Sequence, residues 1–169
     1  MKNYVLRYGL LGGCVSIGLG LFNWFFIAST LGHNASQFIG YLSLILALFC
    51  IPLGIRYFRD KLNDGAVSFG EGFKIGAGIT FITSLMVFLY SALFFVFAGD
   101  DFNAWREKGL TQSELEQVRQ QMVEMPEFVL NPWFQGFVMF LMAFLIGMII
   151  NLISSLVLKS TNKSAIPSK

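Results

Sequence analysis

Long stretches without a charged side chain constrain the fold of this chain more than any other feature. Lys, Arg, Asp and Glu are all missing from three runs, 8–55, 75–99 and 128–158. A membrane-spanning helix needs about 20 mostly apolar residues, at about 1.5 Å of rise each. Four segments come close to or exceed this length, at about 8–28, 38–55, 75–98 and 133–158. The sequence therefore predicts an all-α membrane protein with four transmembrane helices.

Composition agrees with a domain that lies mostly in lipid. Only 13% of the residues are charged, whereas soluble domains have roughly 25%. The first apolar run has the length of a span, and a cleaved signal has an apolar core of only about 7–15 residues, so we expect the run to remain in the protein. We predict a single transmembrane domain over 1–160 and a flexible cytoplasmic tail over 161–169.

The distribution of basic residues predicts the orientation of the spans. Of the 12 Lys and Arg residues, most fall on one side when the loops are taken alternately: Lys2, Arg7, Arg56, Arg59, Lys61, Lys74, Lys159, Lys163 and Lys169. The other side has Arg106, Lys108 and Arg119. Cytoplasmic loops carry the excess of Lys and Arg. We therefore expect both termini and the loop 56–74 in the cytoplasm, and the segment 99–131 outside.

The segment 99–131 contains the signals of a short amphipathic helix. Thr111 and Glu114 have the spacing of a capping box, in which each side chain bonds the backbone N–H of the other residue. An apolar stripe follows on a charged helix that Pro126 should end: Leu115, Val118, Met122 and Met125. Two interpretations stay open. Either the helix lies on the bilayer surface or on the ends of the spans, or its stripe is a docking face for a partner.

Charged residues gather in the loop between the second and third spans. Five of them are candidates for contact with a lipid headgroup or another ligand: Arg56, Arg59, Lys61, Glu71 and Lys74. Basic residues near an anionic membrane surface contribute about 1 kcal/mol each. Ser68 and Glu71 have capping-box spacing, so we expect the third helix to begin ahead of its apolar run. The alternative for this loop is that its opposite charges compensate one another.

This loop also carries a resemblance to a known family. The segments that carry it are 54–61, Gly65 and 68–76 in the loop, together with 39–41 in the second span and 151–155 with Lys159 at the end of the fourth. Over about residues 4–160 the chain resembles the bacterial membrane family catalogued as domain of unknown function 4199. The resemblance implies a four-span protein of the bacterial inner membrane. It implies no activity, cofactor or site.

Small residues recur every four positions in three of the predicted spans. Such stripes let helix backbones approach closely in lipid, where no hydrophobic drive brings helices together. We predict close helix packing at Gly12, Ser16, Gly20, Gly72, Gly76 and Gly147. The contact is made either within one four-helix bundle or between two copies of the chain. Asn23 and Asn151 are expected to form interhelical hydrogen bonds.

Composition argues against several classes of site. The chain has one His and two Cys, which cannot supply a metal cluster or a His-dependent triad, and no cofactor is expected. The basic residues flank the spans and do not form one stripe, so nucleic acid is not an expected partner. No acid or base lies near the centre of a predicted span, which argues against proton or ion coupling.

Three functions remain after these exclusions. The first is a non-enzymatic assembly or accessory protein, whose partners are the lipid bilayer and either a second copy or another membrane protein. The second is a small oligomeric transporter or channel with a path lined by Asn23, Thr80, Thr83 and Asn151. The third is an enzyme at the membrane face that uses Glu71, Lys74 and the cluster 56–61.

Overall fold

Helices make up nearly all of the computed structural model, which describes residues 2–28, 30, 32–108 and 110–160. The helices are α1 Lys2–Phe22, α2 Gly32–Leu48, α3 Cys50–Tyr57, α4 Phe69–Glu107, α5 Gln112–Glu124, α6 Glu127–Leu130 and α7 Pro132–Leu158. Two π-helical turns, η1 Asn23–Ile27 and η2 Phe58–Leu62, continue α1 and α3. The tail predicted over 161–169 lies outside the described residues.

Four helical stretches are long and apolar enough to cross a membrane. They are Asn3–Ile27, Ala35–Leu62, Phe69–Glu107 and Pro132–Leu158. The predicted fold class, an all-α membrane protein with four transmembrane helices, is confirmed.

Two of the helices begin at a capping box. The backbone N–H and the hydroxyl of Ser68 donate to Glu71 Oε2 at 2.9 and 2.7 Å, and the Glu71 N–H donates back to Ser68 Oγ at 3.3 Å. Thr111 makes the same two bonds to Glu114 Oε2 ahead of α5, at 2.9 and 2.6 Å. These side chains satisfy groups that a helix leaves unpaired in its first turn. α4 and α5 therefore start where their sequence spacing predicts.

α4 extends beyond the apolar run of the third span. The run ends at about residue 98, but the helix continues to Glu107. Trp105 Nε1 donates to the backbone O of Ala28 at 2.9 Å, and the Trp105 ring lies edge-on to Trp24 with centroids 6.0 Å apart. These contacts hold the extension of α4 against the end of the first span.

Pro52 divides the second span into two helices. Proline lacks a backbone N–H, and its ring clashes with the carbonyl four residues earlier, here that of Leu48. α2 accordingly ends at Leu48 and α3 begins at Cys50, while the N–H of Phe49 between them is shared by two carbonyls of α2 at 3.1 and 3.2 Å. The second span was predicted as one segment, 38–55, and Pro52 was the available signal for the break.

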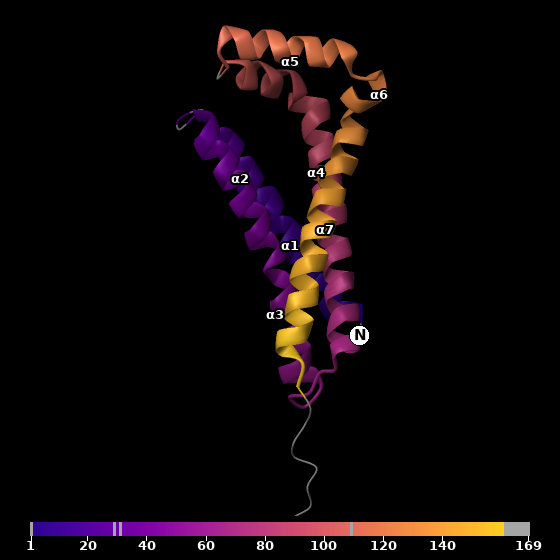
Figure 1. The fold of residues 1–169 in the computed structure, drawn as a ribbon. Helices are drawn as coiled ribbons and strands as arrows, with labels where there is room; N and C mark the ends of the chain where they lie inside the picture. Colours follow the sequence, from indigo (N-terminus) through magenta and orange to yellow (C-terminus); the bar gives the residue numbers. More distant parts are fainter. Residues whose placement is uncertain (1, 29, 31, 109, 161–169) are drawn as a thin grey trace, which may run out of the picture.

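α4 and α7 run antiparallel as the closest pair of helices (Figure 1). A Cβ added at Gly136 would lie 2.9 Å from Ala92 Cβ near one end of the pair, and one at Gly72 would lie 3.4 Å from Ser155 Oγ near the other. α1 and α2 lean together away from α7 on the side of α5 (Figure 1). The spans thus converge at the end that carries residues 58–68, the loop end, and diverge towards the α5 end.

Large buried side chains gather at the loop end. One cluster joins residues of α1, α2, α3 and α4: Tyr4, Leu48, Ile51, Ile55, Ile75 and Ile79. Tyr4 also stacks on Phe58 of η2, with ring centroids 5.8 Å apart. The loop that holds the candidate charged residues is therefore connected directly to a packed interior.

Candidate functional site

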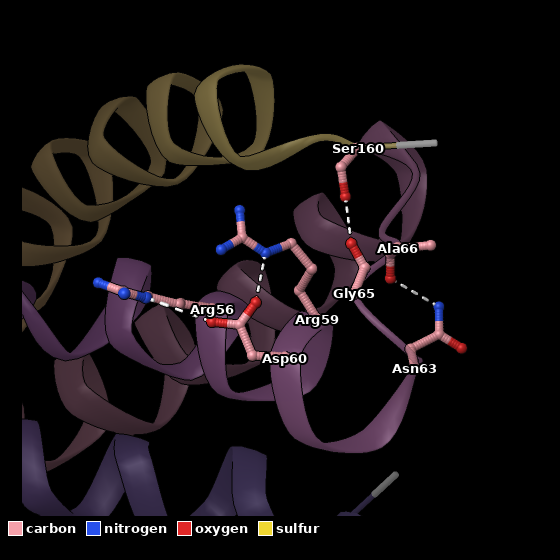
Figure 2. A network of polar contacts seen from close by, with 7 residues as sticks. All are labelled: Arg56, Arg59, Asp60, Asn63, Gly65, Ala66 and Ser160. Atoms are coloured by element: carbon pink, nitrogen blue, oxygen red, sulfur yellow. Dashed lines mark hydrogen bonds and ion pairs between the residues drawn. The ribbon is translucent and has the colours of Figure 1, made fainter. Parts of the chain in front are cut away.

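Two of the five candidate residues share one carboxylate in the loop between α3 and α4. Arg56 Nε lies 3.3 Å from Asp60 Oδ2, and Arg59 Nε lies 2.6 Å from Asp60 Oδ1 (Figure 2). We call these three residues the Asp60 group. Arg59 and Asp60 belong to η2, and π-helical turns occur frequently at functional sites. All three side chains reach solvent, and exposed pairs of this kind add little to stability.

The turn after η2 carries its own hydrogen bonds. Asn63 Nδ2 donates to Ala66 O at 2.8 Å (Figure 2), and the Gly65 N–H donates to Arg59 O at 2.8 Å. Asp64 and Gly65 have φ angles of 47° and 80°, in the left-handed region that glycine adopts freely and aspartate tolerates. Local bonds therefore fix the path of the chain between η2 and α4.

The end of α7 is bonded to the same loop. Val67 and Ser160 form an antiparallel bridge, in which Val67 N–H donates to Ser160 O at 3.0 Å and Ser160 N–H donates to Val67 O at 2.9 Å. The Ser160 hydroxyl also donates to Gly65 O at 2.5 Å, across 95 positions of sequence (Figure 2). No sequence pattern indicated this contact, since neither partner lies in a strand.

The other three candidate residues are not paired with the Asp60 group. Glu71 is bonded to Ser68 in the first turn of α4, and Lys74 follows on the same helix. Lys61 is exposed at the end of η2. Within the described part of the chain, neither Lys61 nor Lys74 forms an ion pair. The five residues therefore do not converge on a single point.

A cavity of about 550 Å³ opens beside this loop. Its lining comes from the start of α4 and the end of α7: Ala66, Val67, Ser68, Phe69, Glu71, Lys159 and Ser160. We call it the bridge cavity, because the Val67–Ser160 bridge forms part of its wall. Its volume falls in the range of small-molecule sites, about 300–1,000 Å³. Lys159, which was not among the candidate residues, lines the same cavity as Glu71.

Polar side chains inside the spans are bonded to neighbouring helices. Asn151 Nδ2 donates to Phe73 O at 3.0 Å, and Asn151 Oδ1 accepts the hydroxyl of Ser155 at 3.2 Å. Thr83 Oγ1 donates to Gly9 O at 3.1 Å. Asn151 and Thr83 are both 0% exposed. These bonds join α7 to α4 and α4 to α1, as expected where lipid supplies no hydrophobic drive for packing.

The four residues named for a solute path do not lie on one surface. Thr80 is fully buried and donates to Gly76 O of its own helix at 2.8 Å. Thr83 and Asn151 are buried between helices, as described above. Asn23 lies in η1, near the α5 end, where its Nδ2 donates to Ser36 O at 3.0 Å. None of the four lines the bridge cavity.

The small residues of α4 and α7 lie directly against side chains of the other helix. A Cβ added at Gly76 would overlap Asn151 Oδ1 and lie 2.5 Å from Asn151 Cγ. A Cβ at Gly147 would lie 2.5 Å from Thr80 Cγ2. Real Cβ contacts essentially never fall below 3.0 Å. Glycine at both positions therefore makes room for the polar side chain opposite.

The stripe on α1 faces helices of the same chain. A Cβ added at Gly12 would lie 2.8 Å from the backbone O of Ala47, and one at Gly20 would lie 2.8 Å from the Tyr90 hydroxyl oxygen. Ser16, between them, is 9% exposed. This geometry favours packing within one chain over a dimer face for these three residues.

Thiols and acids form no metal-binding group in the ranges that the structure describes. No set of three or more His, Cys, Asp or Glu side chains is close enough there to hold a metal ion. Cys14 is exposed on α1 and Cys50 is buried at the start of α3, and both are free thiols. The bridge cavity and the Asp60 group are therefore the polar features from which a function can be argued.

Comparison with known proteins identifies a family and no activity. No curated protein and no solved structure matches the chain. A family model with the description "Protein of unknown function (DUF4199)" matches residues 7–160. The match includes the Asp60 group, the bonded turn and both sides of the bridge cavity. The chain therefore belongs to the DUF4199 family.

Proposed function

We propose that this chain is a multi-pass protein of the bacterial inner membrane with a non-enzymatic role, in which it assembles with a second copy or with another membrane protein. The main support is the use of the polar groups at membrane depth. Asn151 and Thr83 donate to backbone carbonyls of neighbouring helices and are 0% exposed. Polar groups on a solute pathway face a water-filled cavity. Here they join helices, which leaves the outer surface of the spans as the place for function.

That outer surface is strongly apolar. Large side chains are exposed on every span, among them Leu11, Ile45, Phe97 and Ile149. An apolar groove of about 450 Å³ also lies between α1 and α4, lined by Ile17 and Leu21 on one helix and by residues between 86 and 98 on the other. Lipid can cover such a surface, and so can the helices of a partner. Crosslinking from this surface distinguishes lipid from a partner protein.

The test uses one photo-crosslinking residue per span, placed in turn at Leu11, Ile45, Phe97 and Ile149. A partner should give a protein adduct of fixed mass from one face and only lipid adducts from the others. Particle mass in mild detergent then tells a second copy from a different protein. Lipid adducts at all four positions, with a particle of one chain, would contradict the assembly role. Solute flux in proteoliposomes would instead support the transporter alternative.

The enzyme alternative has less support from the loop. Asp60 already pairs with Arg56 and Arg59, and Glu71 Oε2 accepts two bonds from Ser68. Paired charges at a protein surface more often compensate each other than take part in a reaction. A hydrolytic or transfer activity that is lost on Lys74→Gln would overturn this preference.

We also propose that both termini and the loop 56–74 are cytoplasmic, on the basis of the excess of basic residues there. The test is single-cysteine labelling in intact cells, in a background without Cys14 and Cys50. A membrane-impermeant maleimide should label Ser113→Cys on α5 and leave Lys61→Cys unlabelled; both positions are exposed in the structure. Labelling of position 61 but not 113 would reverse the orientation.

A further inference from the structure

Backbone hydrogen bonds fix the frame of the bridge cavity. The Val67–Ser160 bridge joins the segment before α4 to the end of α7 through bonds of 3.0 and 2.9 Å. The Ser160 hydroxyl adds a bond to Gly65 O, and Val67 is only 1% exposed. A site whose walls are already in place loses less conformational freedom when a ligand binds. The cavity therefore has the preformed walls that favour ligand binding.

Two opposite charges reach this frame from different helices. Glu71 lies in the first turn of α4, and Lys159 directly follows α7; both line the cavity. The bonds from Ser68 all go to Glu71 Oε2, and no described residue donates to Oε1. Lys159 forms no ion pair with any described residue. One ammonium and one carboxylate oxygen thus remain for a ligand.

The cavity lies at one end of two candidate spans, where a bilayer that they cross would present its headgroups. α4 and α7 are both candidate spans, and the cavity is at the ends they share, where α4 begins and α7 finishes. Phe69, which is 38% exposed, adds an aromatic ring to the lining. Aromatic rings attract ammonium groups, and lysine is a common ligand of phosphate. The lining therefore offers partners for both a phosphate and an amine.

We propose that the bridge cavity binds a phosphate–ammonium zwitterion, the headgroup of phosphatidylethanolamine, with its phosphate next to Lys159 and its ammonium next to Glu71 and Phe69. An anionic lipid would satisfy Lys159 but place negative charge against Glu71. A simple cation would satisfy Glu71 and leave Lys159 unpaired. Only a ligand with both charges complements both residues. The site does not depend on the proposed assembly role.

Lipid retention by the whole chain tests this site. Native mass spectrometry, after release from nanodiscs with equal amounts of phosphatidylethanolamine and phosphatidylglycerol, counts the lipids that stay bound. We expect the unmodified protein to retain phosphatidylethanolamine preferentially. Glu71→Gln and Lys159→Gln should each reduce this preference by roughly two- to fivefold, the effect of one exposed charge pair. Glutamine also serves in a capping box, so Glu71→Gln should leave the start of α4 intact.

Arg7→Gln is the control, because Arg7 is an exposed base on α1 that does not line the cavity. It should leave the lipid preference unchanged. An equal loss in Arg7→Gln and Lys159→Gln would mean that only general surface charge is involved, and the proposal would be wrong. A preference of the unmodified protein for phosphatidylglycerol would also overturn it. Should Glu71→Gln lower the melting temperature, Lys159→Gln decides alone.

Soluble competitors distinguish a lipid from a free zwitterion. O-phosphoethanolamine carries both charges of the headgroup, whereas inorganic phosphate carries only one sign. Displacement of the lipid by O-phosphoethanolamine alone would support a site open to the free compound. Retention against both competitors would support the lipid as the ligand, because its acyl chains add to the affinity. Equal displacement by inorganic phosphate would reveal a plain anion site and contradict the proposal. The crosslinks described above are unaffected by any of these outcomes.

Discussion

At the loop end of the molecule, α4 and α7 are joined by bonds between residues far apart in sequence, whereas at the opposite end α5 depends on bonds within its own first turn. The loop end has the Val67–Ser160 bridge and, one turn into the spans, the Asn151 side chain on the backbone of Phe73. Gly76 lies directly against Asn151 there. Each of these contacts requires two helices to be in place, so they should form and break with the spans as a whole.

α5 has fewer contacts with the rest of the chain. Leu115 and Val118 of its apolar stripe are half-buried, whereas Val123 is 87% exposed. Arg119 and Glu107 of α4 form an ion pair with an N–O distance of 3.3 Å, and the Arg119 side chain is mostly exposed. Such pairs are weak. Changes at the spans should therefore alter global stability, and changes at α5 should alter only α5.

The largest effect is expected from filling the contacts of α1 at Gly12 and Gly20. Leucine at both positions forces side chains into the space next to Ala47 O and the Tyr90 hydroxyl, at a cost of about 1–3 kcal/mol per site. The melting temperature in detergent should fall clearly. Gly18→Leu is the control on the same helix, because a Cβ there meets no atom within 4 Å. A double variant that keeps the original melting temperature and oligomer size would show that this face of α1 is not packed.

A smaller effect is expected from alanine at single glycines of α4, and it should differ between Gly76 and Gly99. Gly76→Ala should destabilise the protein by about 1–3 kcal/mol, since its methyl group displaces Asn151 from Phe73 O. Gly99→Ala should be neutral or stabilise by up to about 1 kcal/mol, because nothing lies within 4 Å and alanine favours helix. Thermal unfolding measures both. If the two variants melt alike, the close contact of α4 with α7 is not what stabilises the loop end.

Features of the fold that depend on residues close together in the sequence could be predicted, and features that depend on residues far apart could not. Ser68 and Glu71, like Thr111 and Glu114, are three residues apart, so their spacing alone predicted where α4 and α5 start. Apolar length predicted the four spans in the same way. Pro52 also indicated the break in the second span, but the prediction used only the length of the apolar run. Features that depend on residues close together in the sequence could thus be predicted.

The candidate site was predictable only in part for the same reason. The loop 56–74 was chosen from its charges, and four of the five candidates turned out to lie in the Asp60 group or on α4. The bridge cavity was missed, because Lys159 and Glu71 line the same cavity only after α7 has packed antiparallel on α4. Trp105 bonding to Ala28 O is a second contact of this kind, because it joins α4 to the end of the first span across 77 positions of sequence.

Removing a helix cap, which typically costs about 1 kcal/mol of stability, should have different effects at α5 and at the loop end. Thr111→Ala should speed amide exchange over 112–124 and leave the melting temperature unchanged, because α5 has little else to hold it. Ser68→Ala removes the same cap from α4, where the Val67–Ser160 bridge still fixes the entry of the chain. Its effect on exchange should be smaller. Equal effects, or an α5 segment unprotected even before the change, would remove the distinction drawn between the ends.

The smallest expected effect is a pH dependence confined to α5. The Thr111 hydroxyl, and after it the Thr111 backbone N–H, hold the pKa of Glu114 below its ordinary value of 4.5. The ionised carboxylate therefore favours the folded helix above about pH 4.5, and this contribution is lost as the pH falls through the lowered pKa. Protection of residues 112–124, corrected for the intrinsic rate of exchange, should be lower at about pH 3.5 than at about pH 6.

Glu114→Gln keeps a capping partner but cannot ionise, so it should remove the part of the pH dependence that Glu114 contributes, while Glu116 and Glu124 still titrate in both proteins. An identical pH profile in the two proteins would mean that the Thr111–Glu114 bonds do not hold α5 together in solution, and α5 would then have to be stabilised by its contacts with the spans, as the loop end is.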